Sequence, residues 1–265
     1  MLEIRKIETN DTLSVLKAEY FNQTTAPLDG MWHFGFVPMA QHFGFYEGEQ
    51  LIGFCCLNTD GYLLQFYVSQ QAITSADELF ALIIQNNSNV AGKVTGAFVS
   101  TSDPVFLAMC LDHNSSTTVN ALLYCGIQDN TTQDTSIVLK QARQDQLVRF
   151  VDFAVNAIGA PKEWLKGYFG GLIAKQELFG YWKDDQLIAT GECRKFAEYQ
   201  TDYADLGMIV SPDFRGQGIA TDVLRALIAL AKSQELIPMC STEKANLGAQ
   251  KAIVKAGLVT NHRLL

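Results

Sequence analysis

The stretch MIVSPDFRGQGIATDV, from Met208 to Val223, decides how the second half of this chain folds and where it binds a ligand. Its apolar start is typical of a strand, Ser211-Pro212 ends that strand, and the residues after Gly218 have a helical pattern. Glycines at such a junction let the backbone approach a ligand closely, because no Cβ intervenes. The free N–H groups and the positive dipole end of the helix then favour a phosphate.

Two well-known phosphate loops do not fit this stretch. A Walker loop requires Gly-Lys-Ser/Thr, but Ile219 follows Gly218. A dinucleotide fingerprint requires a third glycine where Thr221 stands. We therefore expect an anion-binding junction of another type, with the positive charge of Arg215 beside it.

The pattern Arg-x-x-Gly-x-Ala, formed by Arg215, Gly218 and Ala220, resembles the acyl-CoA loop of the GCN5-related N-acetyltransferases, the GNAT family. The resemblance implies that the loop holds the pyrophosphate of CoA. It also implies that the preceding strand pairs with the pantetheine amides, much as a peptide adds to a sheet edge. The cofactor-binding residues expected on this basis are Met208, Ile209, Val210, Arg215, Gly216, Gln217, Gly218, Ile219, Ala220, Thr221 and Asn246.

Composition narrows the class of protein. The 265 residues are 48% hydrophobic and 18% charged, as in a well-packed globular chain of one large or two ordinary domains. A net charge of −8 argues against nucleic acid or an anionic membrane as the main partner. No secretory segment or membrane-spanning run is apparent, so we expect a cytoplasmic protein. The cysteines show no C-x-x-C spacing and are expected to be reduced: Cys55, Cys56, Cys110, Cys125, Cys193 and Cys240.

The chain contains an internal repeat. FGFY at 43–46 followed by QLIG at 50–53 matches FGYW at 179–182 followed by QLIA at 186–189, and each pair predicts a hairpin. Further matches relate Leu64–Ser69 to Leu206–Ser211 and Leu2–Ile7 to Ile137–Ala142. The fold class predicted is α/β, with two tandem GNAT-like units, each a mixed, mostly antiparallel sheet flanked by helices. We place these units at 1–130 and 135–265, joined by the polar stretch at 128–134.

The repeat also separates the roles of the two units. After Val68-Ser69 the first copy continues through Gln70–Thr74 into a helix with no glycine and no arginine. Such a junction lacks positions where a ligand could approach the backbone. The first unit is therefore interpreted as a degenerate copy that keeps the fold, shapes the acceptor cleft and does not bind CoA.

One part of the family pattern is missing. The segment NLGAQKAIVKAGL, from Asn246 to Leu258, resembles the family's last conserved helix, where Asn246 contacts CoA or serves as the helix N-cap. The family often has a tyrosine in this helix as general acid, and the matching position is Ile253. Thiolate with a pKa of ~8.5 is a tolerable leaving group without such an acid. Tyr199 and Tyr203 are alternatives that the spacing does not distinguish.

The general base has two candidates. Asp205 lies on the strand before the loop, on the same face as Gly207 and Ile209, and Glu192 lies on the preceding strand. A carboxylate there could take the proton of an attacking amine. Each could also be a solvated or ion-paired carboxylate with no catalytic role.

The remaining residues favour no other chemistry. The four histidines have no metal spacing, no G-x-S-x-G elbow is present, and no metal is expected. Two aromatic segments, 160–175 and 28–45, are candidates for the acceptor pocket, although their rings could equally be core.

The function predicted is direct transfer of an acetyl group from acetyl-CoA to an amine. The alternative is a CoA-binding sensor or structural protein with little catalysis. The expected acceptor is a small-molecule or peptide amine. Its identity, the use of other acyl groups and homodimer formation are left open.

Overall fold

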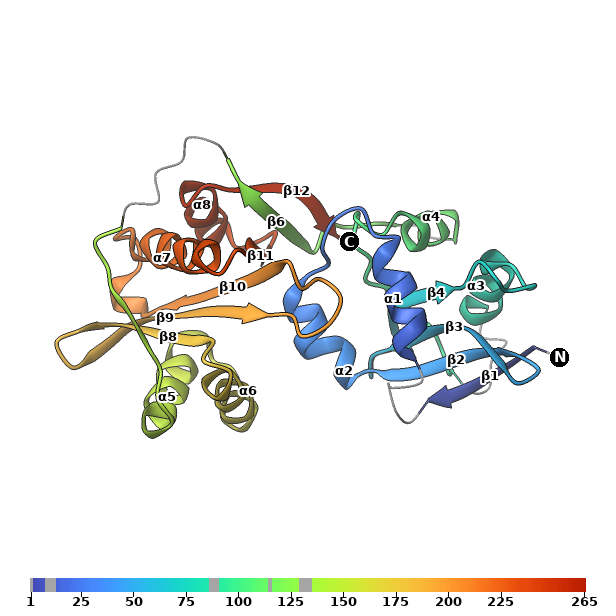
Figure 1. Ribbon diagram of the computed structural model, residues 1–265, viewed down its shortest axis with the longest axis horizontal. Helices are drawn as coiled ribbons and strands as arrows, with labels where there is room; N and C mark the ends of the chain where they lie inside the picture. The colour runs from blue at the N-terminus through green and yellow to red at the C-terminus, as the bar shows by residue number, and fades with distance from the viewer. Residues whose placement is uncertain (1, 8–12, 86–90, 114–115, 129–134) are drawn as a thin grey trace. The chain divides into compact units, whose positions relative to one another are not determined.

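The structure, a computed structural model, describes residues 2–7, 13–85, 91–113, 116–128 and 135–265 (Figure 1). The chain divides into two compact units by its internal contacts. Unit 1 comprises residues 1–122 together with 262–265, and unit 2 comprises residues 123–261. Most of the predicted linker at 128–134 lies outside the described residues.

The described part of unit 1 holds a five-stranded sheet in the order β1-β2-β3-β4-β5. Neighbouring strands are antiparallel except for the parallel pair β4 and β5. Its elements are β1 (Leu2–Ile7), α1 (Ser14–Asn22), the π-helical η2 (Trp32–Phe36), α2 (Val37–Met39), β2 (Gln41–Glu47), β3 (Gln50–Leu57), β4 (Tyr62–Val68), α3 (Ala76–Ile84), β5 (Gly96–Ala97) and α4 (Pro104–His113).

The described part of unit 2 repeats this strand order within a seven-stranded sheet, β12-β6-β11-β10-β9-β8-β7. The pair β10 and β11 is parallel, like β4 and β5. Its elements are β6 (Ala121–Ile127), β7 (Leu139–Gln141), η3 (Gln144–Gln146), α5 (Leu147–Ile158), α6 (Lys162–Ala174), β8 (Leu178–Lys183), β9 (Gln186–Lys195), β10 (Tyr203–Val210), η4 (Pro212–Phe214), α7 (Ile219–Ser233), β11 (Ile237–Glu243), α8 (Leu247–Lys255) and β12 (Leu258–Leu264).

The two predicted hairpins share a local irregularity. The register of β2 and β3 shifts between Phe45 and Tyr46, and that of β8 and β9 shifts between Tyr181 and Trp182, the matching positions of the repeat. The glycine before each shift has its face filled by the corresponding ring and leucine of its own hairpin. The repeat therefore preserves packing as well as residue type.

Helices cover both faces of the sheet of unit 2. In Figure 1, α5 and α6 lie on one side of β8 and β9, and α7 and α8 lie on the other. Alternation along β9 explains this arrangement, because Gly191 faces Leu227 and Val223 of α7 while its neighbours face the opposite way. The buried residues of α5 and α6, including Phe150 and Phe169, form one core with Leu178 and Leu187.

The last strand of unit 2 has a neighbour from the first half of the chain. Strand β12 follows α8, and β6 lies between β12 and β11 in the sheet. Conversely, the final residues belong to unit 1, where Val99 and Leu265 exchange both backbone hydrogen bonds, at 3.2 and 2.9 Å. The two halves of the sequence thus exchange strand segments. Within the described ranges, no helix is long and apolar enough to cross a membrane.

Candidate functional site

Strands β10 and β11 separate after a short stretch of pairing. β11 pairs with β10 only at Tyr203, Ala204 and Asp205, whereas β9 pairs with β10 from Ala204 as far as Val210. Beyond Asp205, β11 no longer pairs with β10 along the stretch that includes Met208, Ile209 and Val210, the residues predicted to contact pantetheine, although the Val210 carbonyl oxygen accepts from Arg215 at 3.3 Å. Open N–H and C=O groups on a sheet edge are what an extended amide chain pairs with.

The predicted loop follows this open edge, as the glycine loop of residues 211–220 (Figure 1). Gly216 and Gly218 have φ values of 77° and 86°, in the left-handed region that glycine adopts without strain. Gly218 is the N-cap of α7 and makes no side-chain cap hydrogen bond. Within the described residues, no protein group accepts from the amides of Gly216, Gln217 and Gly218. These amides form an uncapped helix start suited to an anion.

Arg215 places a positive charge at this loop and also anchors the loop through hydrogen bonds to two backbone carbonyl oxygens. Its Nε donates to the carbonyl oxygen of Val210 at 3.3 Å, and its Nη2 donates to that of Ala157, at the end of α5, at 2.8 Å. The side chain is otherwise exposed, so its other N–H groups face solvent. The charge predicted from sequence is thus held at the loop by two backbone contacts.

The other residues of the predicted site differ in the hydrogen-bonding groups that they can offer to a ligand. The amide of Thr221 donates to the Gly218 carbonyl oxygen at 2.9 Å and its side chain is buried, so Thr221 offers less to a ligand than Ile219 or Ala220. Asn246 acts as the N-cap of α8, accepting from the Ala249 amide at 3.1 Å, and its exposed side-chain NH2 remains a donor. At the position where the family often has a tyrosine, Ile253 of α8 is buried as part of the hydrophobic core.

In unit 1 the corresponding junction is filled by carboxylates. Glu47 accepts from the amides of Ile73 and Thr74, at 3.1 and 2.7 Å, and these bonds lower its pKa, that from Thr74 most. Ser75 and Glu78 then close a capping box at the start of α3. The backbone N–H groups at this junction therefore already donate to carboxylates of the protein. This is a second reason, besides the lack of glycine, why the junction is not suited to an anion.

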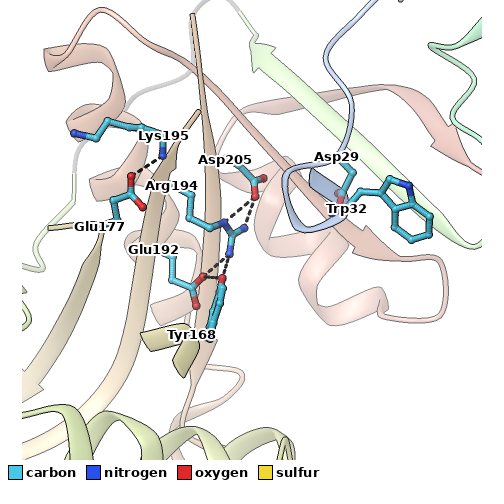
Figure 2. A network of polar contacts seen from close by, with 8 residues as sticks. All are labelled: Asp29, Trp32, Tyr168, Glu177, Glu192, Arg194, Lys195 and Asp205. Carbon is cyan, nitrogen blue, oxygen red and sulfur yellow. Dashed lines mark hydrogen bonds and ion pairs between the residues drawn. The ribbon is translucent and has the colours of Figure 1, made fainter. Parts of the chain in front are cut away.

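Both candidate bases contact one arginine, as Figure 2 shows. Arg194 of β9 donates to Asp205 Oδ2 through Nε, at 2.9 Å, and through Nη2, and it donates to Glu192 Oε2 through Nη1. Tyr168 of α6 donates to the same Glu192 oxygen at 2.6 Å and accepts from Arg194 at 2.6 Å. We call these four residues the Arg194 network. All four lie in unit 2, and the two carboxylates are 5% and 1% exposed.

Burial and charge fix the protonation of two members of the network. The pKa of Tyr168 is raised, first by burial and then by Glu192, so its hydroxyl keeps its proton and donates. Burial acts to lower the pKa of Arg194, but attraction to Asp205, Tyr168 and Glu192 raises it well above its usual value.

Arg194 and Tyr168 were not identified from the sequence. Alternation along β9 places Glu192 and Arg194 on one face, and the antiparallel register sets Arg194 opposite Asp205, so the arginine could have been found by that signal. Tyr168 offers no such signal, because α6 meets β9 only through the tertiary fold. Within the described residues, no cluster of three or more His, Cys, Asp or Glu side chains could hold a metal ion.

Comparison with protein families identifies both halves. Residues 9–126 match the model described as "Acetyltransferase (GNAT) domain", and residues 148–258 match "Acetyltransferase (GNAT) family". A solved acetyltransferase of the GNAT family from Colwellia psychrerythraea is 50% identical, covers 99% of this chain and 97% of its own, and superposes with a TM-score of 0.94. The chain belongs to the GNAT acetyltransferase family. It carries two GNAT domains in tandem.

More distant structures share the tandem fold. A tandem GNAT protein from the clavulanic acid biosynthesis pathway is 14% identical, covers 100% of this chain and 97% of its own, and has a TM-score of 0.68. A GCN5-related N-acetyltransferase from Sphaerobacter thermophilus is 13% identical, with 99% and 93% covered and a TM-score of 0.66. At these identities the likeness concerns the fold alone. No curated protein matches the chain.

Proposed function

We propose that this GNAT protein is an N-acyltransferase that moves an acetyl group from acetyl-CoA to an amine, using unit 2. The observation that carries the proposal is that β10 runs unpaired with β11 beyond Asp205 and leads directly into the uncapped amides of the glycine loop. GNAT proteins use acetyl-CoA, and this edge offers amide partners for pantetheine and an anion site for the pyrophosphate. Arg215 adds charge at the loop, and Asn246 adds a donor at the start of α8.

Unit 1 is proposed to bind no CoA. The carboxylates of Glu47 and Glu78 already accept from the amides at its junction. A pyrophosphate placed there would have to displace them and would meet two like charges. CoA bound next to residues 70–75 would contradict this assignment.

Glu192 is the better candidate for the general base. Asp205 receives two N–H groups of Arg194 and is more deeply buried, so its role in the proposal is to hold the guanidinium. Glu192 uses only Oε2 for Arg194 and Tyr168. Its Oε1 has no hydrogen-bond partner among the described residues and is not sealed from solvent. This oxygen is placed to take a proton from an amine or from a bridging water.

The reaction is written as direct attack. The amine nitrogen forms a bond to the thioester carbon, the carbon–sulfur bond breaks, the amine's proton passes to Glu192, and the thiolate of CoA leaves and takes a proton from water. A covalent enzyme intermediate is disfavoured, because burial raises the pKa of Cys193 and of Cys125 to about 11. With Ile253 buried where a tyrosine is usual, the leaving thiolate has no acid from α8.

Two measurements on the full chain test this function. Calorimetry should detect one CoA site, and release of free thiol from acetyl-CoA should depend on adding an amine. The rate should rise with pH until a single group loses its proton, with no descending limb from a tyrosine acid. Tight CoA binding without thiol release for any amine would favour the alternative, a CoA-binding sensor or structural protein.

A further inference from the structure

A cavity of about 630 Å³ lies within unit 1, between α3, α4 and the start of β4. Both helices pack against β4 (Figure 1). The junction of residues 70–75, which corresponds to the glycine loop of unit 2, follows the other end of β4. The cavity is therefore not the counterpart of the CoA loop, and no role has yet been given to it.

The cavity interrupts the hydrophobic core of unit 1. Leu63, Phe80 and Val99 line it and are buried core residues, whereas Leu107 of α4 is only partly buried and Leu111 is 53% exposed. Protein interiors are close-packed and leave few voids larger than a water molecule. Apolar surface left to water in such a space gains free energy when a ligand covers it. The volume lies in the range of sites that hold small molecules.

Aromatic rings line the cavity from both the sheet and the helices. Tyr62 of β4 and Phe98, which follows β5, have ring centroids 5.0 Å apart. Phe80 of α3 and His113 of α4 form a second pair, with centroids 5.6 Å apart. A planar ring gains buried apolar area and favourable aromatic geometry against such side chains. A flexible aliphatic chain would lose more conformational freedom on binding, so the lining favours an aromatic ligand.

The polar groups of the cavity favour an uncharged ligand. Among the described residues that line it there is no Asp, Glu, Lys or Arg. Thr118 and Asn120 also line it, and their side chains make no hydrogen bond within the described part of the chain. An ion placed here would lose its hydration without meeting an opposite charge. A hydroxyl or carbonyl group could instead pair with these side chains.

We propose that this cavity is a ligand-binding site of unit 1 for an uncharged aromatic molecule that carries a hydroxyl or carbonyl group. All the described residues that line it belong to unit 1, so the site is separate from the proposed CoA site of unit 2. Unit 1 thus binds a ligand of a class different from CoA. The site does not depend on which reaction unit 2 performs.

The test uses prodan, an uncharged naphthalene dye with a carbonyl group, whose emission shifts to shorter wavelength in apolar surroundings. With the full chain we expect saturable binding at one site, unchanged by saturating CoA and by Gly218→Val. 2-Naphthol should displace the dye. Naphthalene-2-sulfonate, which adds a charge to the same ring system, and 1-decanol, which lacks a ring, should compete at least tenfold more weakly.

Two exposed positions of α4 give a matched pair of variants. Leu111→Asp places a carboxylate among the lining residues and should weaken prodan binding at least tenfold. Val105→Asp is the control, because Val105 is also exposed, at 45%, and is not among the residues that line the cavity. It should bind the dye as the wild type does. Thr118→Val keeps the shape of the side chain, removes its hydroxyl and should weaken binding about two- to tenfold.

The site assignment is overturned by dye binding that does not saturate, by binding that CoA displaces, or by equal binding in Leu111→Asp and Val105→Asp. Tighter competition by naphthalene-2-sulfonate or by 1-decanol than by 2-naphthol would overturn the proposed class of ligand.

Discussion

The carboxylate of Glu192 occupies the space that a side chain at position 207 would need. The two residues face each other across β9 and β10, and a Cβ on Gly207 would stand 3.1 Å from Glu192 Oε2 and 3.1 Å from Arg194 Nη1. Glycine at 207 is therefore what lets the Arg194 network lie flat on the sheet beside the open edge of β10. The position of the proposed base depends on a missing side chain on the neighbouring strand.

Gly207→Ala should displace that base without touching the CoA loop. The contact is tighter than an ordinary van der Waals distance, and the buried, hydrogen-bonded network has little room to retreat. We expect the rate of acetyl transfer to fall by about tenfold or more, since small misplacements near the reacting atoms are costly. CoA affinity by calorimetry should stay within error. Gly170→Ala, whose new Cβ meets only Leu147 at 3.9 Å, is the control and should keep full activity.

Glu192→Gln and Asp205→Asn should have different effects. Glu192→Gln keeps the shape of the network and removes the proton acceptor, so the rate should drop roughly 100-fold or more with CoA affinity unchanged. Asp205→Asn removes the charge that holds Arg194 and should lower the free energy of unfolding by ~3 kcal/mol. It should also slow transfer, because the guanidinium that contacts Glu192 is then no longer held in place by Asp205. A rate lost in folded Asp205→Asn but kept in Glu192→Gln would assign the base to Asp205.

The sequence predicts best what local pattern controls. The hairpins, the junction at Gly218 and the repeat all follow from neighbouring residues, and the tandem GNAT fold follows from them. The exchange of strand segments cannot be predicted from neighbouring residues. The strand that pairs with β12 is decided by contacts between residues far apart in the sequence. The sequence leaves the choice between Glu192 and Asp205 open for the same reason, since Tyr168 reaches Glu192 only once α6 packs on the sheet.

Gly218→Val tests the loop assignment. At a φ of 86° a β-branched residue is strained by ~1–3 kcal/mol, and its side chain would point toward an incoming phosphate. We expect at least a tenfold loss of CoA affinity. Gly126→Val in β6 provides a matched control, because Gly126 also has a positive φ, 74°, and open space around it. The control should lose similar stability and bind CoA as the wild type does; equal loss of binding in both would refute the assignment.

Removal of residues 262–265 should weaken unit 1 more than unit 2. These residues supply backbone bonds to Val99, Thr101 and Asn120, and Leu264 is buried. Their loss should cost ~3–5 kcal/mol of local stability. Hydrogen exchange should show faster exchange at those three amides, with β10 amides unchanged. Leu264→Ala keeps the backbone bonds and should cost less; equal exchange rates in the truncated and intact chains would contradict the strand exchange.

Asp103 should make the stability of unit 1 fall as pH rises. It is 1% exposed, and burial raises its pKa to about 6, against the lowering effect of hydrogen bonds from Tyr20 and the Phe106 amide. Because the folded pKa exceeds the unfolded value of 3.8, the folded state binds the extra proton between these values. The contribution of Asp103 is therefore fully present below pH ~4 and lost as pH rises through about 6.

Asp103→Asn keeps an acceptor for the Phe106 amide and removes the charge. Relative to wild type, its free energy of unfolding should rise by up to ~3 kcal/mol between pH 4 and pH 7 in urea titrations. Asp112→Asn, which removes an exposed carboxylate from α4, should run parallel to the wild type. If Asp103→Asn also runs parallel, the carboxyl does not titrate with folding.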